Sequence, residues 1–234
     1  MKKKLIVISL GGSLIVPKEM NIPFLKKFKK TLRSNYFRYK FVVVCGGGVI
    51  ARRYISVLEK EGKSKRALSL AGIRATRMNA IFMMQFFGRE ANGSLPGNMK
   101  EVKDNLEKNK VVLCGALRYD DKATSDTTAA KIAKYLGTDF INMTNVRGLY
   151  TRNPSKDKSA KFIPEISWND FEKMALKIKY KAGQNFVLDQ SAAVLIRESK
   201  IKTYIIGSNN ALNNLLRGKK FAGTLIHKNT SLTI

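Results

Sequence analysis

The sequence predicts an α/β protein, a three-layer α/β/α sandwich built around a mainly parallel sheet. Short apolar runs rich in β-branched residues alternate along the chain with segments whose apolar residues recur at helical spacing. Strands separated by helices are typical of a parallel sheet that is covered on both faces. The 234 residues contain no internal repeat and no proline-rich linker, so we treat residues 1–234 as a single domain.

The first half of the chain begins with two strands, each followed by a helix. Residues 5–10 form a buried strand that stops at a pair of glycines, and residues 41–45 form a second one that stops at three. Apolar residues on one face mark the two helices, namely Phe24, Phe28 and Leu32 in the first and Ile50, Tyr54, Ile55 and Leu58 in the second. Residues 66–87 are rich in Met and lack proline, which predicts a long helix with a break near Gly72.

The rest of the chain continues the same alternation. A glycine- and asparagine-containing loop at 88–99 leads to a third strand at 111–114, and a helix follows Asp126. Phe140 and Ile141 mark a fourth strand. Beyond it we expect a polar loop, two helices and a late strand, at 154–161, 168–176, 192–196 and 203–206.

Composition excludes several classes of protein. A hydrophobic content of 44% excludes a disordered chain, and the apolar runs are far shorter than the roughly 20 residues of a membrane helix. No signal segment is evident, so we expect a cytoplasmic protein. Cys45 and Cys114 each end an apolar run and are interpreted as buried thiols rather than a disulfide. With a single histidine, we expect no protein-built metal cage.

The formal net charge is +27, from 44 Lys and Arg against 17 Asp and Glu. Such a balance indicates either a polyanionic partner, for example nucleic acid, or a lysine-rich solvated surface. The cations are scattered along the whole chain, which favours the solvated surface. Binding to nucleic acid is therefore not expected, although the charge leaves it open.

The two glycine clusters are the strongest local signal for function. Each follows an apolar strand and precedes a helix, so bare backbone N–H groups and a positive helix end can meet an anion. Neither cluster fits the P-loop or the dinucleotide fingerprint. Two anion-binding loops in one chain predict a site that holds two phosphates, and hence phosphoryl transfer.

Longer stretches of sequence resemble a known family. Residues 124–133 and 142–151 resemble the signature of the amino acid kinase superfamily. Within that superfamily, archaeal-type uridylate kinases are the most similar branch. The residues that carry this second resemblance are Gly11–Ser13, Gly46–Arg52, Gly72–Ala80, Lys181–Gly183, Asp189–Ala193 and Gly223–Thr224.

The resemblance implies a kinase that transfers a phosphoryl group from ATP to UMP with Mg²⁺, usually as a homohexamer, on the amino acid kinase fold. It also implies an N-terminal lobe at about 1–137 for UMP and a C-terminal lobe at about 138–234 for ATP. By motif, the residues at the transferring phosphate and the acceptor are Gly12, Ser13, Gly46, Gly47, Gly48, Arg52, Thr124, Ser125 and Asp126. Those implied for ATP are Gly12, Ser13, Gly48, Arg52, Thr144, Asn145, Tyr150 and Asn153.

Physical chemistry supports this division of labour. Phosphoryl transfer relies on fixed dipoles and cations around the transferring group, and UMP already supplies an anionic nucleophile. Asp126 therefore orients a cation or backbone donors rather than removing a proton, and it could also be a helix N-cap. Arg52 could instead lie on a solvated helix face. Trp168 is interpreted as packing, Tyr150 as an ATP contact, and His227 as an edge residue without a catalytic part.

Three positions depart from the family pattern. Ser9 stands where many superfamily members carry a lysine, which leaves charge stabilisation to Arg52 or another cation. Ser69 replaces an aspartate that binds ribose hydroxyls, so nucleoside selectivity stays open. Asn153 replaces a further aspartate near ATP, and because an amide lacks its charge, ATP or Mg²⁺ binding is expected to be weaker.

Two other functions remain open. A kinase of the same fold could use another acceptor, either a carboxylate or isopentenyl phosphate, but the isopentenyl branch depends on a histidine beside the acceptor phosphate. His227 lies near the C-terminus, which argues against that branch. Alternatively, the chain could be a nucleotide-sensing or polyanion-binding protein with weakened catalysis.

Overall fold

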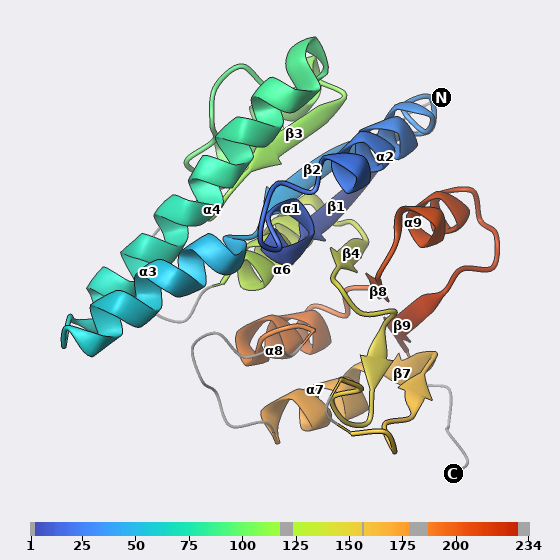
Figure 1. The fold of residues 1–234 in the computed structure, drawn as a ribbon. Helices are drawn as coiled ribbons and strands as arrows, with labels where there is room; N and C mark the ends of the chain where they lie inside the picture. Colours follow the sequence, from blue (N-terminus) through green and yellow to red (C-terminus); the bar gives the residue numbers. More distant parts are fainter. Residues whose placement is uncertain (1–2, 118–123, 156, 178–186, 229–234) are drawn as a thin grey trace.

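A computed structural model describes residues 3–117, 124–155, 157–177 and 187–228. Its core is a seven-stranded sheet that confirms the predicted, mainly parallel α/β architecture (Figure 1). In spatial order the strands are β3 (Val111–Cys114), β2 (Tyr39–Cys45), β1 (Lys4–Leu10), β4 (Phe140–Met143), β8 (Thr203–Ile206), β9 (Gly223–His227) and β7 (Glu165–Ser167). The β8–β9 pair alone is antiparallel within this sheet.

Alternation along each strand produces two apolar cores on opposite faces of the sheet. In β1, Ile6, Ile8 and Leu10 pack into one core, whereas Val7 packs into the other. Because successive side chains of a strand point to opposite faces, Ser9 lies on the same face as Val7. The continuous apolar runs in the sequence therefore reflect strands that are buried on both faces.

The helices form the two outer layers. The layer over the face of Ile8 contains α1 (Gly12–Ile15), α2 (Ile22–Arg33), α4 (Lys65–Phe87) and α9 (Asn209–Leu216). The opposite layer contains α5 (Met99–Lys108), α6 (Ser125–Leu136), α7 (Trp168–Leu176) and α8 (Gln190–Glu198). A separate two-stranded hairpin is formed by β5 (Leu149–Tyr150) and β6 (Phe162–Ile163).

Helix α3 (Gly48–Lys60) pairs side by side with α4 and extends with it away from the sheet (Figure 1). The expected break near Gly72 is wrong, since α4 is one continuous helix. A Cβ at Gly72 would lie 3.4 Å from Cδ1 of Ile55 on α3. The glycine therefore lets the two helices approach closely, and their packing offsets its low helix propensity.

Several elements are absent from the sequence-based expectations. The loop at 88–99 contains a short 3₁₀ turn (Gly88–Glu90) and ends where α5 begins. Asn98 caps α5 by accepting a hydrogen bond from the Glu101 amide at 2.9 Å. Only Val102 and Leu106 of this helix are buried, so its apolar stripe is too sparse to read from sequence. The sequence also did not predict helix α9 or the strands β5, β6, β7 and β9, which are all short.

Other expectations are confirmed by the described residues. Cys45 and Cys114 are buried and free. Trp168 packs against the core, and its indole N–H donates to the Ile201 carbonyl at 2.9 Å. None of the helices in the described part of the chain is long and apolar enough to cross a membrane.

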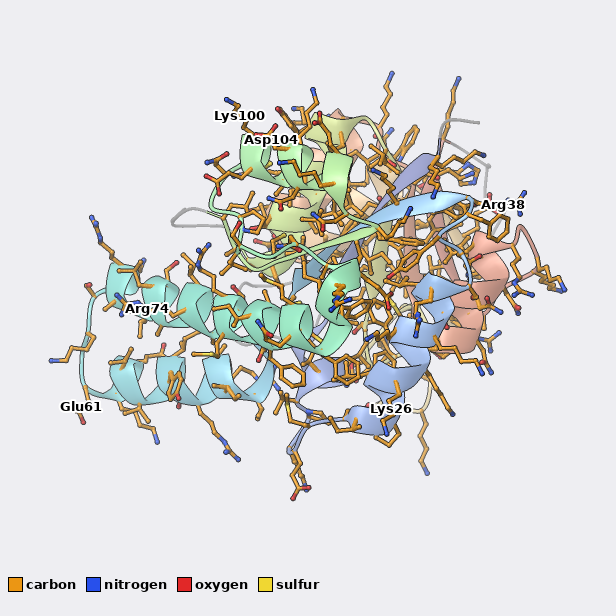
Figure 2. The ribbon with its side chains drawn as sticks, turned by 90° about the horizontal axis from the view of Figure 1, so that it is seen from above. Lys26, Arg38, Glu61, Arg74, Lys100 and Asp104 are labelled. Atoms are coloured by element: carbon orange, nitrogen blue, oxygen red, sulfur yellow. The ribbon has the colours of Figure 1, made fainter. Side chains whose placement is uncertain are left out.

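Charged side chains project outward from many elements. Figure 2 shows Lys26 on α2, Arg74 on α4 and Lys100 on α5 pointing away from the ribbon, with Arg38 before β2 and Glu61 at the far end of α3. Acidic partners are few beside them, because the sequence has 44 cations and 17 acids. The described surface therefore distributes its positive charge widely, as the scattered lysines predict.

Candidate phosphoryl-transfer site

The five parallel strands β3, β2, β1, β4 and β8 end at one edge of the sheet, and small residues follow them there. Gly11 and Gly12 come after β1, and residues 46–48 come after β2. Gly115 and Gly207 follow β3 and β8. In open α/β sheets ligands bind at the carboxyl ends of the strands. This edge is consequently the candidate site.

The two glycine loops predicted from sequence lie against each other. A Cβ added to Gly46 would be 2.5 Å from the amide nitrogen of Gly12, so only glycine fits. Gly48 has φ +65°, in the left-handed region that favours glycine, and α3 begins at this residue. The side-chain amide of Asn79 on α4 donates to the Gly46 carbonyl at 2.7 Å and holds the second loop in place.

The first residues of the two helices follow these loops. Ser13 is the second residue of the short helix α1, and Arg52 lies on α3, one turn beyond Gly48. Arg52 is exposed, and it forms no ion pair with any of the described residues. Its guanidinium is therefore not held by a carboxylate of the described residues.

Helix α6 supplies the acidic residue of the site. Asp126 is not the N-cap, because Thr124 caps the helix by accepting hydrogen bonds from the amides of Asp126 at 3.1 Å and Thr127 at 3.4 Å. Asp126 thus lies in the first helical turn, and its side chain is left for other contacts. Ser125 is the first residue of the helix and is half-buried.

Asp126 contacts Ser9, the residue that departs from the superfamily lysine. The buried hydroxyl of Ser9 donates to Oδ1 of Asp126 at 2.6 Å. Asp126 is half-buried. Burial, and then the negative charge of Asp189, raise the pKa of Asp126 to about 7, and the Ser9 hydrogen bond opposes this rise.

Asp189 was not among the site residues predicted from sequence. It caps α8 by accepting from the Ala192 amide at 2.8 Å, and it also accepts from the hydroxyls of Thr124 and Thr127, the latter at 2.8 Å. The hydroxyl proton of Thr124 is thus engaged by Asp189. A contact of that hydroxyl with UMP would require Thr124 to act as an acceptor or to leave Asp189.

A sequence signal for these neighbours exists. Ser9 and Asn142 are polar residues near the carboxyl ends of buried apolar strands, and the register of β1 and β4 pairs them. A polar residue that interrupts such a run must find a hydrogen-bond partner. Ser9 finds Asp126, and the Asn142 amide donates to the Val187 carbonyl just before Asp189.

The residues expected to bind ATP fall into two groups. Thr144 follows β4 beside the first glycine loop, since a Cβ at Gly11 would lie 3.8 Å from Cα of Thr144, and Asn145 is its neighbour. Tyr150 lies on β5, where its ring meets Phe162 edge to face at 5.5 Å. The structure places Thr144 at the glycine loops, while the ring contact of Tyr150 is with the β5–β6 hairpin.

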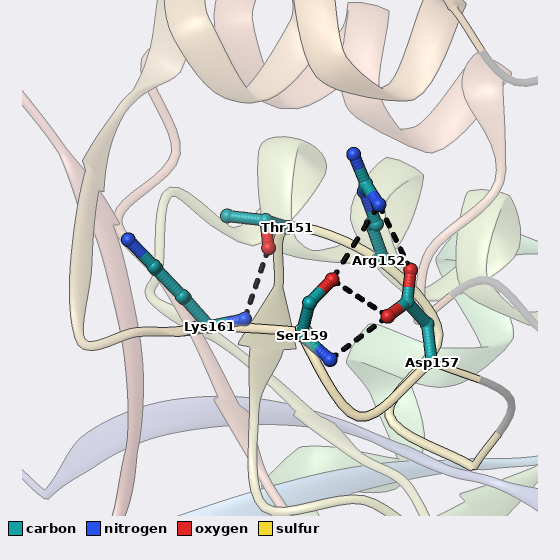
Figure 3. Close-up of polar contacts among 5 residues, drawn as sticks. All are labelled: Thr151, Arg152, Asp157, Ser159 and Lys161. Atoms are coloured by element: carbon teal, nitrogen blue, oxygen red, sulfur yellow. Dashed lines mark hydrogen bonds and ion pairs between the residues drawn. The ribbon is translucent and has the colours of Figure 1, made fainter.

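Asn153 belongs to the loop between β5 and β6. Figure 3 shows that side chains of this loop, among them Arg152, Asp157 and Ser159, contact one another. Its Oδ1 accepts from the Ser155 amide at 2.9 Å. Arg152 pairs with Asp157 at 3.0 Å, and Ser159 donates to Asp157 through its hydroxyl at 2.6 Å and its amide at 2.8 Å. The Ser159 hydrogen bonds, followed by the one from Arg152, lower the pKa of Asp157 to about 2. The Asp157 carboxylate is therefore held by Arg152 and Ser159, and the Asp157 amide donates to the Asn153 carbonyl at 2.9 Å.

Other predicted residues lie outside this cluster. His227 pairs with Glu165 on the neighbouring strand, next to the start of β8 and so at the opposite edge of the sheet from the glycine loops. Ser69 is on α4, about two turns before Ala75 and Thr76, which lie against Gly47. Residues Lys181–Gly183 lie outside the described part of the chain.

Comparison with known proteins agrees with this geometry. The amino acid kinase family model matches residues 4–207, which is most of the chain. The chain belongs to the amino acid kinase family. This membership accounts for the fold.

Archaeal uridylate kinases are similar over nearly their whole length. The Thermococcus kodakarensis protein is 31% identical over 224 residues, covering 94% of this chain and 98% of its own. The Archaeoglobus fulgidus uridylate kinase is 34% identical over 223 residues, with 94% and 99% covered. Its crystal structure superposes with a TM-score of 0.81 over 94% of this chain and 99% of that one, at 33% identity. A UMP kinase from Ureaplasma parvum, at 20% identity and a TM-score of 0.80, shares the fold.

Proposed function

We propose that this protein is a uridylate kinase, which transfers the γ-phosphoryl group of ATP to UMP and yields UDP and ADP. The observation that carries the proposal is the close contact of two glycine loops at the carboxyl edge of the sheet. Asp126 is hydrogen-bonded to Ser9 on β1, the strand that leads into the first of these loops. The archaeal relatives, which are named uridylate kinases, support UMP as the acceptor. We place this activity in the cytoplasm, in pyrimidine nucleotide synthesis.

The two loops have separate tasks in this mechanism. The Gly47 amide receives the UMP phosphate, whereas the Gly46 amide already donates to the Leu10 carbonyl at 2.9 Å and Gly46 shapes the loop. The amides of Gly12 and Ser13 receive the transferring phosphoryl group. Arg52 neutralises the charge that collects between them. The attacking atom is a phosphate oxygen that is already anionic, so the protein only has to hold both phosphates in line.

Asp126 acts as a fixed charge. In its ionised form the carboxylate accepts hydrogen bonds, and it orients the donors and cations that surround the phosphates. Thr124 and Ser125 begin the same helix, whose amino terminus favours an anion. We assign these two residues to the UMP side of the site.

ATP is assigned to the carboxyl half of the chain. Thr144 and Asn145 lie beside Gly11 and can contact the phosphates of ATP, together with Gly48 and Arg52. Tyr150 offers an aromatic face for the nucleoside, and Asn153 offers an amide in place of the family aspartate. In this arrangement the phosphates of both nucleotides meet at the carboxyl end of β1, which lies between β2 and β4.

Magnesium would enter with ATP. The described residues contain no group of three or more His, Cys, Asp or Glu side chains that could hold a metal ion. The ion would neutralise phosphate charge when bound, and the residues of the chain position the two nucleotides. Phosphate oxygens are its usual partners in enzymes of this kind.

The family resemblance also proposes a homo-oligomer, a hexamer. Exposed apolar side chains on the α3–α4 pair support an assembly, namely Tyr54, Val57, Met78 and Ile81. Light scattering of the purified protein tests this. A monomer at micromolar concentration would contradict the oligomer without contradicting the chemistry.

A phosphorylation screen with ATP, Mg²⁺ and the acceptors UMP, CMP, dUMP, AMP and isopentenyl phosphate tests the proposed function. We expect UDP as the main product. If another acceptor is phosphorylated faster, that compound rather than UMP is the substrate. Calorimetric binding of UMP and ATP without any UDP would instead support the nucleotide-sensing alternative, for which the asparagine at 153 and the serine at 69 are the motivation.

A further inference from the structure

The two carboxylates at the start of α6 and α8 differ in their hydrogen bonding. Asp189 accepts from three donors, the Thr124 and Thr127 hydroxyls and the Ala192 amide. Among the described residues, Asp126 accepts from Ser9 alone. The charge of Asp189 is therefore well solvated by protein groups, whereas that of Asp126 depends on a single hydroxyl.

We propose that Ser9 and Asp189 are positioning residues that control, in opposite directions, the charge which Asp126 carries during phosphoryl transfer. Ser9 stabilises the ionised carboxylate by donating a hydrogen bond, and Asp189 destabilises it by placing a second negative charge nearby. The inference rests on the proposed function for its kinetic consequence, but not for the interaction itself.

The surroundings of Asp126 leave these two residues as the main controls. Among the elements packed against α6, β1 contributes Ser9 and α8 contributes Asp189. On the same face β2 contributes Val42 and Val44, and β4 contributes the uncharged Asn142. Helix α5 also packs against α6 and contributes the buried Val102 and Leu106. Among the described residues, the charge that acts on the pKa of Asp126 is that of Asp189.

Ser9 thereby takes on part of the task of a lysine at this place in the superfamily. A lysine there would bring a full positive charge to the site, whereas a serine hydroxyl brings only a hydrogen-bond donor. The donor is rigidly held, because Ser9 is fully buried and lies within a strand that pairs on both sides. If the hydroxyl of Ser9 were removed, a water molecule could not take its place unless β1 repacked.

The expected consequence is a turnover that rises with pH around neutrality. Burial raises the pKa of Asp126 to about 7, so its carboxyl group changes charge within the neutral pH range. Ser9→Ala removes the stabilising donor and should move the acidic limb of the kcat profile upward by about one pH unit or more. Asp189→Asn removes the opposing charge and should move the same limb downward by a similar amount.

Profiles of kcat from pH 5.5 to 9, with saturating UMP and Mg²⁺-ATP, test these shifts. Ser9→Thr keeps the hydroxyl and should restore the wild-type limb. Thr128→Val is the matched control, since Thr128 in the same helical turn donates to the Thr124 carbonyl at 3.0 Å and contacts neither carboxylate. The position of the limb does not depend on the fraction of folded enzyme, so a purely structural effect of Ser9→Ala would lower the profile without moving it.

A second measurement separates this inference from the proposed function. Carboxyl ¹³C chemical shifts of the substrate-free protein report the titration of Asp126 directly, assigned with Asp126→Asn. We expect its midpoint to rise in Ser9→Ala and to fall in Asp189→Asn. Midpoints and kcat limbs that stay at the wild-type position in both variants would overturn the inference. Shifted midpoints in a protein that makes no UDP would keep the interaction and contradict the kinase assignment.

Discussion

The amide nitrogen of Gly48 lies where a side chain at Gly12 would begin, since a Cβ added to Gly12 would be only 2.0 Å from it. The opposing atoms are backbone and cannot rotate away. Gly12→Ala should therefore destabilise the protein by about 3 kcal/mol or prevent folding. Gly93→Ala is the control, because nothing lies within 4 Å of that Cβ. Equal melting temperatures for the two variants would contradict the observed contact.

Gly47→Val should abolish UMP binding, through a clash with α3. A Cβ at Gly47 would be 2.5 Å from Cβ of Ala51, while its φ of −79° is ordinary, so the left-handed glycine of the loop is Gly48. The milder Gly47→Ala should weaken UMP binding, and adding Ala51→Gly should recover part of it by removing the opposing methyl group. Calorimetric titration measures the UMP affinity of these variants. An unchanged UMP affinity in Gly47→Val would contradict the assignment of this glycine loop to the UMP phosphate.

Asp126→Asn should lower turnover by at least about 10²-fold, because it removes the fixed charge at the site of transfer. The measurement is the UDP formation rate of a variant whose circular dichroism matches that of the wild type. A folded Asp126→Asn protein with wild-type turnover would remove Asp126 from the mechanism.

The same substitution should stabilise the protein at alkaline pH. Asp126 has a pKa of about 7 when folded, against 3.8 as the ordinary value, so between these pH values the folded state holds the extra proton. Its contribution to the free energy of unfolding therefore falls as pH rises from about 4 to about 7. Asp126→Asn should be more stable than wild type by up to about 4 kcal/mol at pH 8, and about equal at pH 4. Denaturant titrations at both pH values measure the difference.

Arg52→Gln should lower kcat/KM by about tenfold or more with little change in melting temperature. Arg52 is exposed and forms no ion pair within the described residues, so its loss should cost the fold little stability. Arg53→Gln, on the next and equally exposed position of α3, removes the same charge and should retain activity. Similar kinetics for the two variants would indicate a general charge effect in place of a specific phosphate contact.

The positive surface should bind single-stranded RNA weakly, with a steep loss as salt rises. Cations precede or begin most parallel strands at the edge opposite the site, and Lys3 has a lowered pKa there through burial and the nearby charges of Lys110 and Lys40. Contacts to 6–10 phosphates would lose roughly 10³ to 10⁵ in affinity between 50 and 200 mM salt. Fluorescence anisotropy measures this, and tight binding that persists at about 0.2 M salt would mean a shaped RNA site.

Local patterns predicted much of the fold. Helix α7 spans the predicted residues, and strands β1, β2 and β3 lie where apolar runs meet glycine or polar residues. The missing elements are those without a local signal. Strand β9 forms because β7 and β8 flank it, and these partners lie about 20 to 60 residues earlier in the chain. Pairing of that range depends on the finished sheet rather than on the five residues of the strand.

The sequence by itself determined the glycine loops, because bare backbone at the end of a buried strand is a local property, and it determined Asp126 through the family motif. The tertiary structure alone decided what Asp126 contacts. Ser9 lies 117 residues before it and Asp189 lies 63 residues after it, yet both reach the same helical turn. Hydrogen bonding and the interaction between charges depend on distances of a few ångströms, which follow from how β1, α6 and α8 pack together.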